Sequence, residues 1–417
     1  MTKQHRIITT AISFALLSPV AVFATDGYQL IGVGSYQKSL GGAVTANPGS
    51  AMTSVSNPAG AARIESRADF SMEAFMPERK VDFRGMGGAK NKSEVDMYGV
   101  PAIGWQAPTS DDSELHFGGG MYGTSGMGVD YSQVDMMQGM KWDGYSNISF
   151  WQMAPVLAKN INKKLSVGAT INVDYQSVAF KQRVMQGNNV VENFDLSRSS
   201  SSFGFGFGVG LLYDINDKLT LGVNYKSKQN FSDLKYQLAS GDIMSKGNAM
   251  PGGEYKLDLD FPQQAALGIA FKPTSKLTIS GDIKWIDWSS TMGNKLNVRG
   301  PNGIKVPMNP GWDDQTIYAL GVSYAVNDKV NIRAGYNYAS APFDSKKVIN
   351  NLILPALVES HYTLGADYKV NKHWDLGFHY MYAPKKTEKA PATDPMAPGA
   401  ATSLSETSLG ANIGYRF

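Results

Sequence analysis

The sequence predicts an all-β fold: a transmembrane antiparallel β-barrel of 14 strands with a small N-terminal hatch, or plug, inside its lumen. Three observations predict it. The chain begins with an export signal, later segments alternate apolar with small or polar residues, and short turns alternate with long loops. After the first 24 residues there is no apolar run of about 20 residues, as a helical membrane protein would need.

The N-terminus reads as a targeting segment. Three basic residues lie among the first six, an apolar stretch follows from Ile7 to Leu17, and small residues end at Ala24. This pattern predicts a secretory signal peptide over residues 1–24, cleaved between Ala24 and Thr25. The alternative, an N-terminal membrane anchor, is disfavoured because the apolar stretch is too short to cross a bilayer. A lipoprotein anchor is excluded because the chain contains no Cys.

Composition excludes several function classes. The net charge of +3 and the lack of a Lys/Arg cluster argue against nucleic-acid binding. His116, His361, His373 and His379 stand in no zinc-ligand spacing, and there is no G-x-S-x-G motif. The glycines of residues 204–210 recur with period two, which indicates a strand rather than a phosphate loop. We therefore expect no enzyme activity, no cofactor and no metal.

The strands are predicted from two-residue periodicity. From Val330 to Tyr338, large apolar residues alternate with Asn331, Arg333, Gly335 and Asn337, so one face meets lipid and the other the lumen. The same reading along the chain predicts fourteen strands, at residues 69–80, 96–106, 114–123, 148–159, 163–176, 203–214, 218–228, 262–272, 275–287, 314–326, 329–340, 360–371, 373–383 and 404–417.

The lengths of the connections distinguish a barrel from a soluble β-sandwich, whose strands also alternate apolar with polar residues. Short turns occur at 214–218, 272–276, 327–329 and 371–373, whereas the links 226–261, 288–313, 340–360 and 383–404 are long. Short periplasmic turns and long external loops are typical of bacterial outer-membrane barrels. An even strand count places both ends of the barrel in the periplasm. A closed barrel needs no partner subunit, so we expect a monomer in contact with outer-membrane lipid and lipopolysaccharide.

Residues 25–67 do not read as strand. They are rich in Gly, Ala, Ser and Asn and carry little charge. A segment of small residues fits compact packing inside a lumen, whereas a flexible periplasmic arm, the alternative, would carry more charge. The expected organisation is therefore a signal peptide (1–24), a hatch (25–67) and a barrel (68–417).

A family resemblance rests on short motifs that occur in a fixed order over almost the whole mature chain. The chain resembles the FadL/TodX family of hydrophobic-compound transporters. The motifs are Asp26-Gly27-Tyr28-Gln29-Leu30, Gly41-Gly42-Ala43, Asn57-Pro58-Ala59-Gly60, Phe261-Pro262, Trp285-Ile286-Asp287-Trp288-Ser289, Trp312-Asp313-Asp314, Arg333-Ala334-Gly335-Tyr336 and Gly414-Tyr415-Arg416-Phe417. The terminal Phe417 resembles the signal read by the barrel-assembly machinery. One departure is that Thr53-Ser54-Val55-Ser56 stands where an acidic pair often precedes the Asn-Pro-Ala element.

The resemblance implies passive uptake of long-chain fatty acids or related hydrophobic compounds, with lateral exit through the barrel wall. Exit in the family lies beside a kinked third strand that contacts the Asn-Pro-Ala element. Here the implied gate is Asn57, Pro58 and Ala59, and the third strand carries Gly118, Gly119 and Gly120. Three glycines favour a kink or bulge. We expect these two elements to contact one another.

Two further sets of residues are candidates for substrate contact. The long loop 226–261 carries apolar side chains that favour external capture, although they would equally serve to pack the loop: Phe231, Leu234, Tyr236, Ile243, Met244 and Met250. Cations of lumen parity are candidates for contact with a carboxylate, although nearby acids such as Asp282 and Asp375 would pair with them: Lys284, Arg333, Lys369 and Arg416.

Two alternatives remain. A general diffusion porin would have an open lumen, which the segment 25–67 disfavours. An aromatic-hydrocarbon transporter of the same family fits the sequence equally well, because loop composition does not distinguish the two substrates.

Overall fold

A computed structural model describes residues 26–108, 113–293 and 296–417. The predicted signal peptide, residues 1–24, and its cleavage site lie outside these described residues. Within them no helix is both long and apolar enough to cross a membrane.

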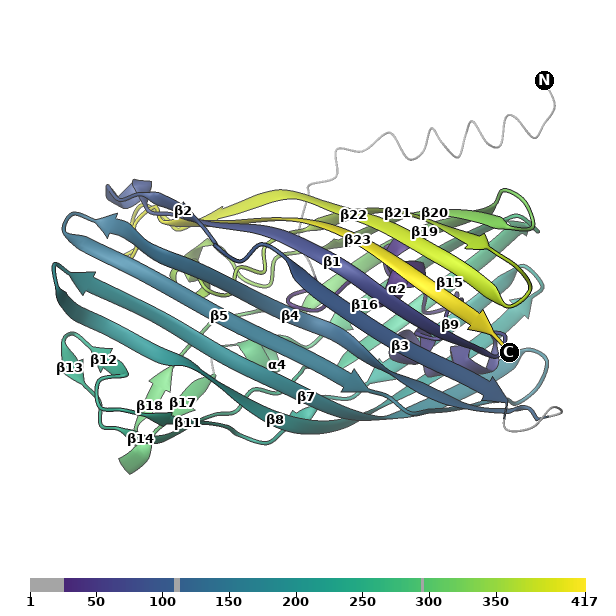
Figure 1. Cartoon of the computed structure of the whole chain (residues 1–417), viewed down its shortest axis with the longest axis horizontal. Coiled ribbons are helices and arrows are strands. Elements are labelled where there is room, and N and C mark those ends of the chain that lie inside the picture. Colours follow the sequence, from purple (N-terminus) through teal and green to yellow (C-terminus); the bar gives the residue numbers. More distant parts are fainter. Residues whose placement is uncertain (1–25, 109–112, 294–295) are drawn as a thin grey trace, which may run out of the picture.

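The described strands form a closed antiparallel barrel with fourteen strand positions (Figure 1). The ring closes because β1 and β23 pair along their whole lengths, from Arg67 opposite Arg416 to Asp82 opposite Ala401. In chain order the barrel strands are β1 (Arg67–Asp82), β3 (Tyr98–Pro108), β4 (Leu115–Met137), β5 (Met140–Met153) with β6 (Val156–Asn160), β7 (Leu165–Gln186), β8 (Asn189–Asn216), β9 (Leu219–Lys226), β15 (Gln264–Thr274), β16 (Leu277–Ile286), β19 (Gln315–Ala325), β20 (Val330–Ala339), β21 (Ser360–Lys369), β22 (Trp374–Lys389) and β23 (Ala401–Arg416).

The predicted number of strands is confirmed, but four predicted strands are too short. β5 and β6 occupy one position, since both lie between β4 and β7 and only Ala154 and Pro155 separate them. β4, β5, β7 and β8 continue well beyond the predicted spans at their external ends. Those extensions carry apolar side chains on the inner face, among them Val129, Phe180 and Leu196, so the lipid-facing stripe used for the prediction does not mark them.

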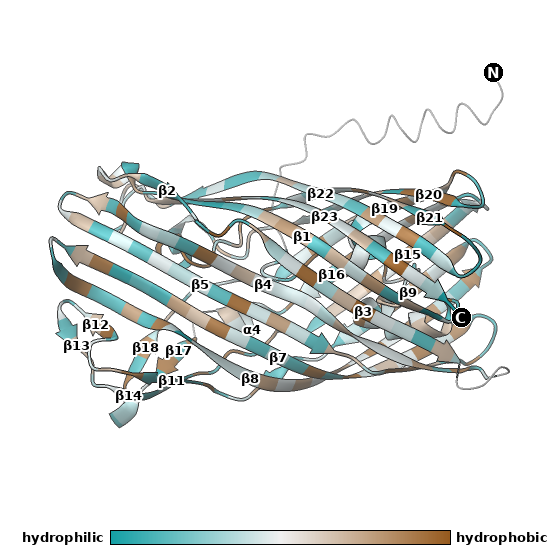
Figure 2. Cartoon of the chain, in the orientation of Figure 1, coloured by the Kyte–Doolittle hydropathy of each residue, from teal (hydrophilic) through white to brown (hydrophobic). Residues whose placement is uncertain are grey.

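The two faces of the wall follow the predicted alternation. Outward side chains such as Phe205 and Leu364 are about three-fifths exposed, at 61% and 59%, whereas the lumen-facing Asn337 and Thr363 are buried. Figure 2 shows brown apolar positions recurring along the strands among paler and teal ones. Outward apolar side chains gain free energy from lipid, while every strand hydrogen bond is made within the ring.

Long connections gather at one end of the barrel, and short turns and the C-terminus at the other (Figure 1). The external connections contain β2 (Lys90–Lys92), η2 (Arg84–Met86), β10 (Asn230–Phe231), β12 (Ile243–Ser245), β13 (Asn248–Ala249), α4 (Ser289–Met292), η3 (Pro301–Gly303), η4 (Ser345–Lys347) and η5 (Ile349–Asn351). A separate four-stranded sheet joins β11 (Leu234–Leu238), β14 (Gly253–Leu257), β17 (Asn297–Arg299) and β18 (Lys305–Pro307). Their apolar side chains merge with the external half of the lumen in one buried cluster.

Residues 26–66 lie inside the ring. They form α2 (Gly34–Ser39), α3 (Thr53–Ser56) and η1 (Pro58–Ala62), and most of their side chains are buried. In Figure 1 the purple helix α2 is seen behind the front strands of the barrel. The contacts described next show which strands surround it.

Candidate transport path

A tight turn shapes the N-terminal segment. Gly41 and Gly42 both have positive φ, at 62° and 82°. A Cβ on Gly42 would lie 2.1 Å from the carbonyl oxygen of Ile31, and one on Gly41 would meet the backbone of Tyr336. Only glycine fits this conformation and this close approach, so the turn fixes where the segment meets β20.

Polar contacts fasten the segment around the circumference of the lumen. Asp282 of β16 accepts hydrogen bonds from the backbone N–H groups of Val44 and Thr45, at 2.9 and 2.8 Å. Further contacts reach β1, β20, β21 and β22: Ala51 N to Asp69 at 2.6 Å, Asn337 to Gly41 O at 3.1 Å, Thr363 to Ser39 O at 3.1 Å, and Ser35 with His379 at 3.1 Å. The segment is therefore held from several sides and occupies the lumen.

Asn57, Pro58 and Ala59 lie against β7 and β8. Asn57 is fully buried, accepts the N–H of Ala59 at 3.1 Å and donates to Thr45 O at 2.7 Å and Leu211 O at 3.1 Å. Gly168 and Gly210 leave room for this element, because a Cβ on either would meet Pro58 or Asn57 at under 2.9 Å. The residues that we expected to contact Gly118–Gly120 thus pack mainly on another part of the wall.

Replacing Asn57 with Ala is expected to loosen the segment without opening the barrel. The change removes the hydrogen-bond partner of the Thr45 and Leu211 carbonyls and of the Ala59 N–H. Each buried group left unpaired lowers the free energy of unfolding by about 1–3 kcal/mol. Hydrogen exchange of amides 41–62 should accelerate while amides of β20 and β21 stay protected. The matched control is Asn216→Ala, which removes a cap only from a short turn. Equal exchange in both variants would contradict the assigned role of Asn57.

The wall is interrupted between β3 and β4. β3 pairs with β4 only from Ala102 opposite Tyr122 to Pro108 opposite His116. Beyond this, β4 bonds with the N-terminal segment: Gly126 N donates to Tyr28 O and Leu30 N donates to Thr124 O, both at 3.0 Å. Further out, residues 89–94 resume pairing with β4, since Glu94 N donates to Asp130 O at 2.7 Å. The result is a window whose edge is occupied by residues 28–30.

Local chemistry explains why pairing stops there. Pro101 of β3 has no N–H to donate, and β4 has a register shift between Gly123 and Ser125. Gly123, Gly126 and Gly128 carry no side chain into the interval. A Cβ on Gly128 would lie only 2.6 Å from the hydroxyl oxygen of Tyr98, so the Tyr98 hydroxyl takes up space that a side chain at position 128 would need.

Gly118, Gly119 and Gly120 lie on β4 just below the window. They face the break between β5 and β6, where Ala154 N donates to Gly120 O at 3.1 Å, and Gly119 has a φ of 153°. A link to the N-terminal segment runs through Tyr122, whose hydroxyl is 2.8 Å from Ser54 Oγ. These glycines are therefore coupled to α3 through Tyr122 and not by direct packing on Asn57.

A cavity of about 150 Å³ connects the lumen with the window. Its inner lining includes Tyr28, Phe75 and Phe150, and its wall side includes Val100 of β3, the three window glycines of β4 and the outward-facing Trp151 of β5. Most of these side chains are apolar, which suits a hydrophobic guest. The cavity is thus lined both by residues of the lumen and by residues of the window.

The predicted capture residues lie outside this cavity and outside two others near the N-terminal segment. Leu234, Tyr236 and Ile243 are buried, and Phe231 and Met250 pack against the same external cluster. Met244 is half-buried in a short hairpin with Ala249. In this structure the six side chains join the loop to the top of the barrel.

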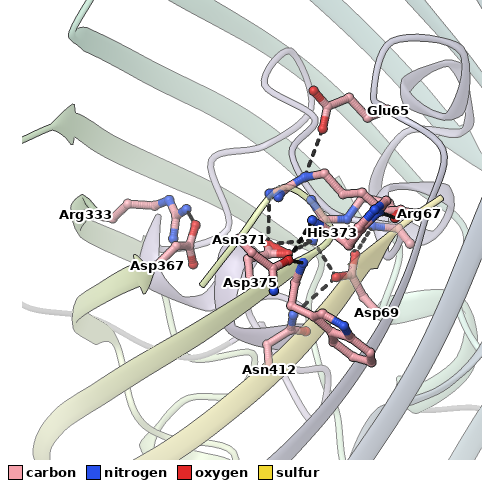
Figure 3. Close-up of polar contacts among 12 residues, drawn as sticks. Glu65, Arg67, Asp69, Arg333, Asp367, Asn371, His373, Asp375 and Asn412 are labelled. Atoms are coloured by element: carbon pink, nitrogen blue, oxygen red, sulfur yellow. Dashed lines mark hydrogen bonds and ion pairs between the residues drawn. The ribbon is translucent and has the colours of Figure 1, made fainter. Parts of the chain in front are cut away.

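Three of the four predicted carboxylate contacts have acidic partners. Lys284 pairs with Asp26 and Arg333 with Asp367. Arg416 contacts Glu65 at 2.9 Å and Asp375 at 3.2 Å. Figure 3 shows these two acids in the periplasmic group, together with Arg67 and Asp69. Lys369 is exposed at the margin of a polar cavity that Arg67 and Arg416 also line. These charges join strands and segment to one another.

Sequence reasoning missed an aromatic cluster above the N-terminal segment. Tyr28 lies 4.7 Å from Trp288, and Trp288 lies 5.2 Å from Trp312, centroid to centroid. Phe261 joins them at 5.7 Å from Tyr28 and stacks on Phe150 at 4.4 Å. Each of the first four aromatics stands in a motif noted in the sequence, yet no local pattern shows that the four motifs meet.

Among the described residues, no group of three or more acidic or His side chains forms a metal site.

Comparisons with known proteins agree with this architecture. The family model described as outer membrane protein transport protein (OMPP1/FadL/TodX) matches residues 21–417. The chain is 26% identical over 220 residues to a 47 kDa outer membrane protein of Pasteurella multocida, covering 50% of this chain and 49% of that protein. It is 27% identical over 181 residues to outer membrane protein P1 of Haemophilus influenzae, covering 42% of this chain and 37% of that protein. The chain therefore spans half or less of the length of these two relatives. The crystal structure of the toluene transporter TodX of Pseudomonas putida is similar with a TM-score of 0.74 at 20% identity, covering 93% of this chain and 99% of that one.

Proposed function

The chain belongs to the OMPP1/FadL/TodX family of outer-membrane transporters for hydrophobic compounds, and we propose that it takes up such molecules passively, releasing them sideways into the membrane. The outer-membrane location follows from the family and the barrel fold. Long-chain fatty acids or related amphiphiles are the proposed substrates. Residues 26–66 are proposed as the hatch that blocks the direct route to the periplasm.

The cavity that reaches the β3–β4 window carries this proposal. A hydrophobic solute in the lumen would otherwise have to pass the hatch and enter water. The window instead offers a route from an apolar lining directly to hydrocarbon. Each CH₂ group transferred into lipid contributes about 0.8 kcal/mol, so the last step needs no ATP or proton coupling.

The hatch is proposed to act as the gate of this window. Residues Tyr28–Leu30 hold the edge of β4 by only two backbone hydrogen bonds of 3.0 Å. Tyr28 also packs in the aromatic cluster beneath the external loops. A substrate that displaces Tyr28 would therefore loosen the edge strand as it enters. The filled lumen weighs against the general diffusion porin, which would need an open water path.

Uptake of labelled oleate by cells that lack their own transporter tests the function. Expression of this chain is expected to restore uptake, and Gly126→Val is expected to slow it by placing a branched side chain in the window, where Gly126 lines the cavity. Gly281→Val is the matched control, because it lies on the outer face of β16 and its Cβ would meet nothing closer than 3.7 Å. No uptake with the wild-type chain would refute the proposed substrate, and equal slowing by both variants would refute the route.

A further inference from the structure

Most buried cations of the lumen are neutralised by carboxylates. Lys38 pairs with Glu73 at 2.9 Å, and Arg67 pairs with Asp69 at 2.6 Å and with Asp375 at 3.0 Å. Lys284 and Arg333 pair with Asp26 and Asp367. Such pairing is expected, because a buried charge without a counter-charge is strongly destabilising. An incoming carboxylate gains little from a cation that is already neutralised.

Arg79 of β1 differs from these cations. Its side chain faces the lumen, the residue is 3% exposed, and it forms no ion pair with any carboxylate of the described residues. The guanidinium donates from Nη2 to Val95 O and, at 3.3 Å, to Ser93 Oγ, and it lies over the ring of Tyr98 at 5.4 Å. Its Nε–H is buried and has no hydrogen-bond partner. Arg79 therefore retains both an uncompensated charge and a free donor.

The surroundings of Arg79 favour a ligand with one anionic group and an apolar body. Arg79 lines the cavity that reaches the window, together with apolar side chains such as Ile31, Phe75 and Ile148. Tyr131, near the guanidinium, has a buried hydroxyl that also lacks a partner. Glu406 is the one acid among the described residues that line this cavity, and its charge disfavours a second negative charge on the ligand. It lies opposite Pro77, two residues from Arg79, and 3.3 Å from His361 Nε2.

We propose that Arg79 is a binding subsite for the carboxylate of a monoanionic amphiphile whose apolar tail occupies the cavity. This inference rests on the proposed uptake function and assigns a residue to the recognition of its substrate. The guanidinium donates its free Nε–H to the carboxylate, as charge-assisted hydrogen bonds of this kind are the strong ones. The cations selected from strand parity, Lys284, Arg333 and Arg416, serve instead as structural ion pairs.

Binding of oleate and of oleyl alcohol to the purified, nanodisc-embedded protein tests the proposal, because the two probes share a tail and differ in charge. The wild type is expected to bind oleate more tightly at pH 8. Since a hydrogen bond to a charged group is being lost, Arg79→Gln should weaken oleate binding about tenfold or more. The same variant should leave oleyl alcohol binding unchanged, and Arg79→Lys should restore part of the preference. Arg333→Gln, at an arginine already paired with Asp367, is the matched control and should keep the preference.

The outcomes separate this proposal from the uptake function. Equal affinity of the wild type for both probes overturns the carboxylate subsite even if Arg79→Gln fails to fold. Equal weakening of both probes in Arg79→Gln also overturns it, since that result indicates packing and not charge recognition. In either case the uptake function stands so long as cells expressing the chain accumulate oleate. Absence of binding to either probe, together with absence of uptake, defeats the uptake function itself.

Discussion

Oxidation of a cysteine pair at Val100 and Gly123 is expected to abolish uptake, and reduction to restore it. These positions face one another across the window: a Cβ on Gly123 would lie 3.0 Å from Cγ1 of Val100. This places the two Cβ atoms close to the separation of about 3.5–4.5 Å that a disulfide requires. The bond would join β3 to β4 where backbone pairing is missing. Since the chain has no native cysteine, the introduced pair has no competing partner.

The control pair is Val322→Cys with Ala334→Cys, which lie opposite one another on β19 and β20 in an unbroken part of the wall. This disulfide should leave uptake unchanged in both redox states. Labelled oleate uptake with and without reductant is the measurement. Full uptake by the oxidised window pair, with the bond verified by mass spectrometry, would show that substrate leaves by another route.

Deletion of residues 26–62 is expected to make the barrel conduct ions, whereas the intact chain is expected not to. Much of the lumen wall that meets this segment is glycine, so the wall alone leaves an unfilled interior. The glycines whose Cβ would collide with the segment are Gly104, Gly168, Gly210, Gly222, Gly268, Gly321, Gly335 and Gly365. The barrel should still close, because β1 and β23 pair independently of the segment. Planar-bilayer recordings should show persistent steps for the deletion and none for the intact chain.

Folding of the deletion variant is checked by its heat-modifiable migration in SDS gels. A shortened external loop, with residues 241–250 removed, is the control for loss of bulk and should stay silent. Large persistent conductance of the intact chain would contradict the plugged lumen and favour the porin reading. A folded deletion variant without conductance would show that the external loops alone close the pore.

The barrel could be predicted from sequence because one face of each strand meets lipid and the other faces the lumen. Apolar and polar residues therefore alternate with a period of two. Ile332, Ala334 and Tyr336 must meet lipid, so Arg333 and Asn337 must face inward, and the structure agrees. The external extensions of β4, β5, β7 and β8 could not be predicted in this way. Their buried apolar side chains, such as Val129, Phe180 and Leu196, face inward and pack in the external cluster, so the lipid-facing stripe that revealed the other strands is missing from them.

Contacts inside the lumen were harder to predict because they join residues far apart in sequence. Parity placed Lys284 and Arg333 in the lumen but did not reveal Asp26 or Asp367 as their partners. The packing of Asn57 on Gly210 has no local signature, since glycine-rich inner faces occur on several strands. Arg79 falls within a predicted strand of lumen parity, yet its importance comes only from the absence of a partner, which a sequence does not show.

The seam between β1 and β23 joins the two ends of the barrel sequence. Because the first barrel strand pairs with the last, the ring cannot seal until the entire chain has been exported. Until β23 arrives, the outward face of β1, with Phe70 and Met72, is left without its final neighbour. Long-range closure of this kind is slow and leaves apolar surface exposed until it is complete.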